Sequence, residues 1–288
     1  EEIKVENLNN LIERNLQNAK GGINYELHHT IAGMMATQMQ MPRNSFQEIT
    51  TPSTEEQTKS IVLGFFKDLD DELYKKVKEI MEGTSEIGFN MYSANSDIVG
   101  TPLHPGQPCV LKEDGRPIVC LPYEGTIQDV YLLTHELSHT FDMMPRENIT
   151  RYQLGEVTAS CFEGMLSSYL LKNNLISKED AVNREKGIRQ QHYAHAVKTF
   201  AKLELMKTKQ QKGTITREDL EDMKNRNNLD NNQMDLVMRE LCSSNPDSIY
   251  EIRCMLAQLI YPHYMEQYNQ NPQEAIQKNE MLLGENKR

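Results

Sequence analysis

Thr134-His135-Glu136-Leu137-Ser138-His139-Thr140 is the stretch of the chain that decides the fold. It holds the pattern H-E-x-x-H within residues 129–141, which contain neither proline nor glycine and are therefore predicted to be helical. Residues four apart share one face of a helix, so His135 and His139 can bind the same metal ion. Glu136 lies beside them, where its carboxylate can take a proton from a metal-bound water. The simplest alternative is a solvated helix with two unrelated histidines.

A catalytic zinc ion needs a third protein ligand in addition to two histidines. The acidic residues after the motif that could supply it are Asp142, Glu147, Glu156 and Glu163. Asp142 lies on the same predicted helix as the histidines, whereas Glu156 lies on the next helix and can close the coordination shell from another side. Glu156, Ser160 and Glu163 share one face of that second helix. We predict Glu156 as the third ligand. Glu163 and Ser160 are predicted to contact the ligands without binding the metal, and Glu163 to orient a zinc-binding histidine. The alternative is that both carboxylates are simply solvated.

Charge and composition exclude several classes of protein. The 288 residues include 42 acidic and 31 basic ones, and the net charge of −11 argues against nucleic acid or a membrane surface as partner. The longest apolar run, 60–66, is far shorter than the roughly 18 residues of a membrane span. Five cysteines without a framework spacing favour free thiols and a cytoplasmic location, with a secreted form whose signal has been removed as the alternative. The oligomeric state is not indicated.

Most of the chain is predicted to be helical, because apolar residues recur at spacings of three and four. The predicted helices cover 8–19, 24–40, 54–66, 68–81, 126–141, 154–171, 178–207, 217–225, 231–242 and 248–268. Two β-prone pieces, 108–111 and 117–121, flank an Asp-Gly pair that favours a hairpin. We expect a mainly α fold with a small β-hairpin or sheet. In it, residues 1–82 form a helical lobe packed on a catalytic region, 83–288, as one compact unit.

Residues 116–126, Arg-Pro-Ile-Val-Cys-Leu-Pro-Tyr-Glu-Gly-Thr, together with the H-E-x-x-H helix, resemble the core of the oligoendopeptidase F and thimet oligopeptidase family. In that family of zinc metallopeptidases, a strand and a Tyr-x-Gly-Thr turn precede the zinc helix. The stretch from Glu156 to Glu163 resembles the second family signature, whose first glutamate is the third zinc ligand. The resemblance spans about residues 25–270, the catalytic half of such an enzyme, without the amino-terminal lobe that helps to roof the substrate channel. It implies a zincin-like metallopeptidase catalytic domain with one zinc ion per chain.

The chain departs from the family at two positions of the zinc helix. Ser138 stands where the family usually has glycine, and Asp142 stands where it often has a third histidine. Neither position is a zinc ligand in the family. The resemblance therefore still implies zinc binding, but helix packing and the shape of the cleft are open.

A third departure lies in the carboxy-terminal helix. The family places there a histidine, followed by tyrosines that bind the developing oxyanion. Tyr261 and Tyr264 keep a compatible spacing, but the expected histidine would fall near Ile252 or Arg253. His263 is a candidate substitute for this histidine, and Arg253 is the alternative.

The resemblance implies hydrolysis of peptide bonds in oligopeptides or unstructured protein segments. His135, His139 and Glu156 would hold the zinc, and Glu136 would accept the proton of the zinc-bound water that attacks as nucleophile. The strand at 117–121 has an edge that could pair with an extended peptide or protein substrate. A catalytically weak or inactive zincin-fold binding protein is the alternative, and a zinc hydrolase for other substrates is a third possibility.

Overall fold

The computed structural model describes a set of ranges within the chain. These are residues 9–10, 12–13, 49–93, 110–111, 117–142, 155–227, 229–231, 234–235, 237–238, 261 and 263–272, with the backbone alone at 93, 110–111, 117, 142, 155–157 and 188–200. Two compact units make up the chain. The histidine unit comprises Phe46–Lys186 and Leu259–Arg288, and the α9 unit comprises Glu1–Ser45 and Gly187–Gln258.

These units differ from the expected division into residues 1–82 and 83–288. Helix α3 (Glu55–Leu69) contacts α5 (Ile127–Asp142), the helix that carries the H-E-x-x-H motif. Helix α4 (Asp71–Met81) contacts strand β1 (Gly88–Ser93). Helices α3 and α4 therefore belong with the motif helix, because α3 packs on it and α4 packs on the sheet, whereas residues 1–45 belong to the α9 unit.

Local capping signals set the starts of α3 and α4, which are the helices predicted at 54–66 and 68–81. Thr54 Oγ1 accepts a hydrogen bond from Gln57 N at 3.2 Å, and Gln57 Oε1 accepts one from Thr54 N at 2.8 Å. Such a capping box satisfies two backbone donors that a helix start would otherwise leave open. The Asp70 carboxylate caps α4 in a similar way. Both predictions are confirmed, and α3 continues three residues beyond the predicted end, to Leu69.

The sheet has three strands in the order β1-β3-β2. Strands β2 (Val110–Leu111) and β3 (Pro117–Tyr123) pair antiparallel, which confirms the predicted hairpin. Strand β1 pairs with β3 in parallel and was not predicted. Because β1 occupies its other side, β3 is a central strand, and the expected edge strand at 117–121 is wrong. On its β2 side, the described pairing covers only Pro117 and Ile118.

The turn between β3 and α5 is fixed by hydrogen bonds from residues of the Tyr-x-Gly-Thr stretch. Asp129, in the first turn of α5, accepts the backbone N–H groups of residues 124, 125 and 126 at 2.8–3.1 Å. Gly125 has a φ of +89°, in the region that favours glycine. The Tyr123 hydroxyl donates to Ser53 O, and Ser53 N donates to Gly125 O at 3.0 Å. This network fixes the direction in which α5 leaves the sheet.

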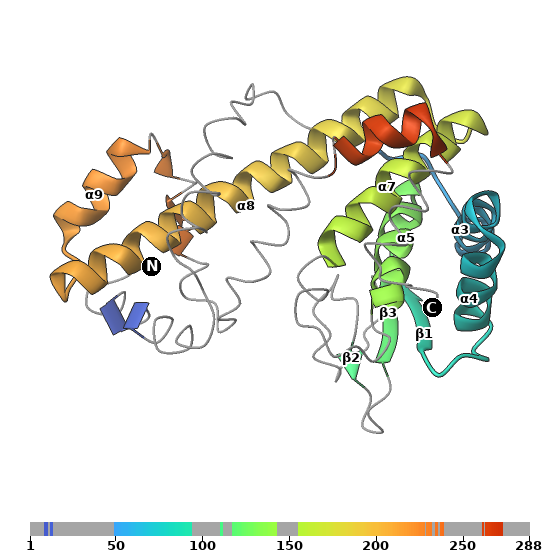
Figure 1. Cartoon of the computed structure of the whole chain (residues 1–288), viewed down its shortest axis with the longest axis horizontal. Helices are drawn as coiled ribbons and strands as arrows, with labels where there is room; N and C mark the ends of the chain where they lie inside the picture. The colour runs from blue at the N-terminus through green and yellow to red at the C-terminus, as the bar shows by residue number, and fades with distance from the viewer. Residues whose placement is uncertain are drawn as a thin grey trace. The chain divides into compact units, whose positions relative to one another are not determined.

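Helix α7 (Gly155–Lys172) packs on α5, and α3 covers the pair (Figure 1). Phe66 of α3, Phe141 of α5 and Phe162 of α7 contact one another with ring centroids 5.6–5.7 Å apart. All three aromatic side chains are buried. This aromatic cluster fills the space between the three helices and so holds the motif helix in a rigid frame.

Helix α8 (Lys178–Lys212) begins in the histidine unit and continues into the α9 unit, five residues beyond its predicted end. Its start is set by Ser177 and Asp180, whose side chains accept each other's backbone N–H groups at 3.0 and 3.1 Å. In the α9 unit, α8 and α9 (Arg217–Arg226) enclose an apolar core. Its buried members are Ile12, Ala201, Leu205, Met206, Ile215, Met223, Leu229 and Val237.

The remaining predicted helices are described only in part. The segment 24–40 lies outside the described residues, whereas the described residues of 8–19, 231–242 and 248–268 are helical. The structure is thus mostly helical with a small sheet, as predicted. Over the ranges that it describes, no helix is long and apolar enough to cross a membrane.

Candidate active site

The two motif histidines lie together on one face of α5. The ring centroids of His135 and His139 are 4.8 Å apart, and the ring planes are nearly perpendicular. His139 is buried, whereas the His135 side chain keeps 21 % of its surface exposed. The Ser138 hydroxyl donates to His135 O at 2.6 Å. The serine that replaces the glycine of the resembled family is therefore accommodated within the helix.

Helix α7 runs antiparallel to α5 and brings polar side chains to the histidine face. The hydroxyls of Tyr131 and Ser167 are 3.0 Å apart, and His135 Nδ1 is 2.6 Å from Glu163 Oε1. From Tyr131 to His135 the contact moves four residues forward along α5, and its partner moves four residues backward along α7, from Ser167 to Glu163. The two helices are therefore antiparallel. Glu163, the expected partner of a zinc histidine, is in hydrogen-bonding contact with His135. That His135 binds zinc stays a prediction.

The charge of Glu163 determines the protonation of the His135 ring. Burial favours the neutral acid, but the adjacent Arg184 guanidinium and the hydrogen bond with His135 outweigh it and lower the Glu163 pKa to about 2. A carboxylate can only accept hydrogen bonds, so Nδ1 of His135 carries the proton. In the neutral ring, Nε2 is then the nitrogen with a lone pair for a metal ion.

Arg184 is a residue of this site that the sequence analysis missed. Its Nη2 donates to Glu163 Oε2 at 2.7 Å, and its guanidinium carbon lies 4.8 Å from the centre of the Tyr131 ring. The Arg184 side chain is 18 % exposed. Burial raises the pKa of Tyr131 to about 12, so its ring stays neutral beneath the cation. An arginine two turns into the helix after α7 was the available signal, but only the fold shows which carboxylate it meets.

The other predicted residues of the motif face are described to different extents. Glu136 is 1 % exposed, and Ser160 is buried one turn before Glu163. Glu156 lies in the first turn of α7, and its side chain is outside the described residues. Among the described side chains, no three His, Cys, Asp or Glu residues form a group that could hold a metal ion. His135 and His139 fit a zinc site for two reasons. They lie on the same face of α5, and the contact of His135 Nδ1 with Glu163 leaves Nε2 available to bind the metal.

The carboxy-terminal helix of the histidine unit packs on α7 beside Glu163. A Cβ atom on Gly164 would lie 2.6 Å from Tyr261 Cε2 and 2.7 Å from Met265 Sδ, so the absence of a side chain permits this close approach. The Tyr264 hydroxyl lies in the interior, 3.7 Å from Met165 Sδ. His263 is exposed, with its Nε2 3.1 Å from Gln267 Nε2. The structure thus places Tyr261 against Gly164 and Tyr264 against Met165 of α7, whereas His263 is exposed.

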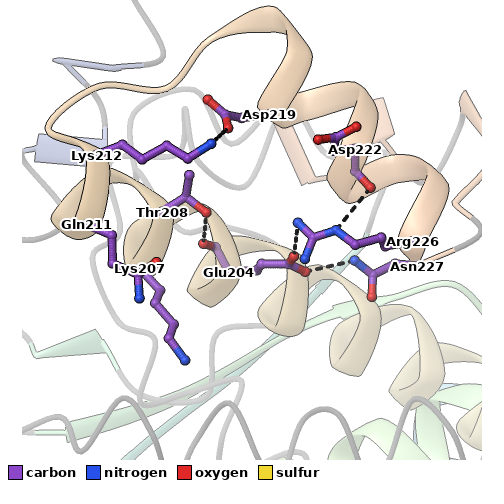
Figure 2. A pocket seen from close by; sticks show the side chains of 9 residues that line it. All are labelled: Glu204, Lys207, Thr208, Gln211, Lys212, Asp219, Asp222, Arg226 and Asn227. Atoms are coloured by element: carbon purple, nitrogen blue, oxygen red, sulfur yellow. Dashed lines mark hydrogen bonds and ion pairs between the residues drawn. The ribbon is translucent and has the colours of Figure 1, made fainter.

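A polar pocket of about 450 Å³ lies in the α9 unit, on α8 and α9 (Figure 2). Its lining residues are Glu204, Lys207, Thr208, Gln211, Lys212, Asp219, Asp222, Arg226 and Asn227. The charged groups pair across the helices: Lys212 binds Asp219, and Arg226 Nη2 lies 2.6 Å from Glu204 Oε1. These pairs join α8 to α9, which accounts for their arrangement without a ligand.

Comparison with known proteins finds structures of similar fold but no similar sequence. No protein-family profile and no curated protein matches the sequence. The structure is similar to that of a candidate oligoendopeptidase F from Bacillus anthracis str. Ames, with a TM-score of 0.54 and 14 % identity over 96 % of this chain and 49 % of that one. It is equally similar to that of a candidate peptidase from Chlamydophila abortus, with a TM-score of 0.54 and 14 % identity over 98 % of this chain and 48 % of that one. The chain therefore shares its fold with these two proteins and spans about half of their length.

Proposed function

We propose that this chain carries a zinc-dependent endopeptidase site on α5 and α7, which hydrolyses peptide bonds in oligopeptides or unstructured protein segments. The observation that carries the proposal is the 2.6 Å contact between His135 Nδ1 and Glu163 Oε1, beside His139 on the same helix face. A histidine that binds a metal almost always donates its other ring N–H to such an acceptor. The fold supports the proposal, because the two similar structures are described as those of a candidate oligoendopeptidase F and of a candidate peptidase.

In this proposal, Nε2 of His135 and a ring nitrogen of His139 bind the zinc ion, and Glu156 is the third ligand. Two histidines and one glutamate, with a position left open, are a donor set of catalytic zinc sites. When bound, zinc would polarise the scissile carbonyl and increase the acidity of water at neutral pH. The protein contributes the orientation of the ligands, which comes from the Glu163 contact and from the packing of α5 on α7.

Glu136 is the proposed general base. It follows His135 directly on α5, and a carboxylate buried to 1 % exposure is shielded from bulk water. It would take a proton from the attacking water and deliver it to the leaving amine. Such proton transfer typically contributes a factor of about 10²–10⁴ in rate.

Tyr261 is the proposed hydrogen-bond donor to the oxyanion that forms on the peptide carbonyl. It packs on α7 next to Glu163, whereas the Tyr264 hydroxyl would first have to leave Met165. His263 faces solvent beside Gln267 and is the least favoured of the three. Loss of one oxyanion donor costs on the order of 10²–10³ in kcat.

A second candidate function is a binding protein that keeps the fold but cleaves nothing. The similarity to the two peptidase structures fits this candidate equally well, because at 14 % identity it carries the fold and not the activity. Both functions predict bound zinc, so only cleavage separates them.

The test is digestion of a defined peptide pool by the wild type and by Glu136→Gln, with products identified by mass spectrometry and zinc content measured in parallel. We expect about one zinc per chain in both proteins, cleavage by the wild type that a chelator stops, and no cleavage by the variant. Exposed Glu124→Gln is the matched control and should cleave like the wild type. Full activity in Glu136→Gln would refute the mechanism. Zinc bound by a wild type that cleaves no peptide would favour the binding protein.

A further inference from the structure

We propose that Arg184, two turns into α8, is a positioning residue for the metal site, because it holds the Glu163 carboxylate in the orientation that fixes the His135 ring. This inference rests on the proposed function, since it assigns a role toward the zinc ligand His135. It adds a fourth helix, α8, to a site whose predicted residues came from α5, α7 and the carboxy-terminal helix. Arg184 does not touch substrate or metal; it acts through Glu163.

The two oxygens of Glu163 have separate partners. Oε1 lies 2.6 Å from His135 Nδ1, and Oε2 accepts from Arg184 Nη2 at 2.7 Å. The Glu163 side chain is only 10 % exposed, so little water is available to replace either partner. Rotation of the carboxyl group about its last bond would break both contacts at once. Arg184 therefore restrains the angle at which Glu163 meets the imidazole.

Arg184 is itself held in place from two sides. Its guanidinium carbon lies over the fully buried Tyr131 ring, 4.8 Å from the ring centre. The Tyr131 hydroxyl contacts Ser167 Oγ at 3.0 Å, and Ser167 Oγ donates to Glu163 O at 3.2 Å. The Ser177 cap fixes the start of α8 seven residues earlier. The network thus closes on itself, and each member has a partner on a different helix.

The geometry requires arginine and not merely a positive charge. A planar guanidinium can stack on the Tyr131 ring and still direct an N–H group at Glu163, because its donors lie in the plane of the stack. A lysine ammonium is a point charge on a flexible stem and would satisfy only one of the two contacts well. Arg184→Lys should therefore recover part of the function and Arg184→Met none of it.

The expected effect is on metal affinity and on the ring of His135. Removal of an outer partner of a metal-binding histidine typically weakens metal binding by about 10–100-fold. Arg184→Met should show a loss in that range, and Arg184→Lys a smaller one. In the metal-free wild type, the His135 proton should sit on Nδ1, opposite Glu163. In metal-free Arg184→Met, the proton should be shared between the two ring nitrogens.

The experiment measures zinc affinity by competition with a chromophoric chelator and the His135 tautomer by ¹⁵N NMR of the metal-free protein. Lys186→Met is the matched control, because it removes a positive charge from an exposed position two residues further along α8. We expect the control to match the wild type in both measurements. Circular dichroism verifies folding, and if Arg184→Met does not fold, Arg184→Lys decides the question.

The outcomes separate this inference from the proposed function. An unchanged His135 tautomer and unchanged zinc affinity in Arg184→Met would overturn the inference, as would equal losses in Arg184→Met and Lys186→Met. If the wild type bound no zinc, the proposed function would fail. The tautomer of the metal-free protein would then still decide whether Arg184 orients His135 through Glu163.

Discussion

Arg184 and Glu163 in the histidine unit are 2.7 Å apart, and Arg226 and Glu204 in the α9 unit are 2.6 Å apart. Both pairs join α8 to a neighbouring helix. Their exposure differs: Arg184 and Glu163 are 18 % and 10 % exposed, whereas Arg226 is 65 % exposed beside a Glu204 that is 12 % exposed. The same pair of functional groups at the same distance thus occurs once in the interior and once at the surface.

The second oxygen of each carboxylate shows what the difference means. Glu204 Oε2 accepts from Asn227 Nδ2 at 2.8 Å, a residue at the end of α9 that closes the helix (Figure 2). Glu163 Oε1 instead meets His135 in the motif. The pair in the α9 unit only joins two helices. The pair in the histidine unit also places the Glu163 charge next to the His135 ring, whose tautomer decides which nitrogen can bind a metal. Distance alone would not distinguish these roles.

The largest expected effect is on stability when the buried arginine is removed. Arg184→Met leaves the Glu163 carboxylate in the interior without its cation, which typically costs about 3–5 kcal/mol. Arg226→Met removes a mostly exposed partner, which typically costs about 1 kcal/mol or less. Urea unfolding of both variants in the presence of a chelator measures the difference without a contribution from metal binding. Equal losses would show that burial does not separate the two pairs.

A second substitution should partly repair the first. Because the cost of Arg184→Met comes from an unpaired buried charge, adding Glu163→Gln removes that charge and recovers about 1–3 kcal/mol relative to the sum of the single changes. The corresponding double variant of Arg226 and Glu204 should recover less than about 1 kcal/mol, since solvent already screens that pair. Double-mutant cycles from the same urea titrations give both coupling energies. Additive losses at Arg184 and Glu163 would mean that the two residues act independently.

Local patterns in the sequence predicted much of the fold. Thr54 and the acidic residues after it predicted the start of α3, and the apolar spacing predicted α5 and α7. The Asp-Gly pair predicted the β2–β3 hairpin. Strand β1 was missed because its pairing with β3 is parallel and joins segments far apart in the chain, for which no turn signal exists. The central position of β3 was missed for the same reason.

In the candidate site, too, local sequence patterns predicted residues along one helix but not contacts between helices. Glu163 could be predicted because its spacing from Glu156 places both on one face of a helix, and helical spacing is local. Arg184 could not be predicted, because its contact with Glu163 depends on how α8 returns along α7 after the turn at Ser177. A buried carboxylate beside a histidine implies a cation nearby, but the sequence does not say which one. Periodicity identified residues on one helix, and packing identified the residue between helices.

A third comparison uses two glycines, one in each unit. An alanine at Gly164 would press on Tyr261 and Met265, at a typical cost of about 1–3 kcal/mol for overpacking. Gly213, after α8, has a φ of +76° and open space around it, so an alanine there costs about 1 kcal/mol through backbone strain alone. Thermal unfolding and kcat distinguish the two variants. Only Gly164→Ala should also lower kcat, by up to about 10²-fold, because the added methyl group would displace Tyr261 from its position as hydrogen-bond donor to the oxyanion. An unchanged kcat would argue against that role for Tyr261.

The smallest expected effect concerns the pairing of Lys212 with Asp219 at the exposed pocket. Hydrogen bonds from the Lys212 side chain and from Thr216 lower the Asp219 pKa from its ordinary 3.8 to about 2. Because the folded-state pKa is lower than the unfolded one, the contribution of Asp219 to stability is present above about pH 4 and is lost as the pH falls toward 2. Asp219→Asn should therefore lower the melting temperature slightly at pH 6 and not at pH 2. Salt should shrink that difference, since Lys212 is 62 % exposed, and should leave the effect of Arg184→Met nearly unchanged. A salt-insensitive difference at Asp219 would place this pair with the buried one, and exposure would then no longer explain the contrast between the two units.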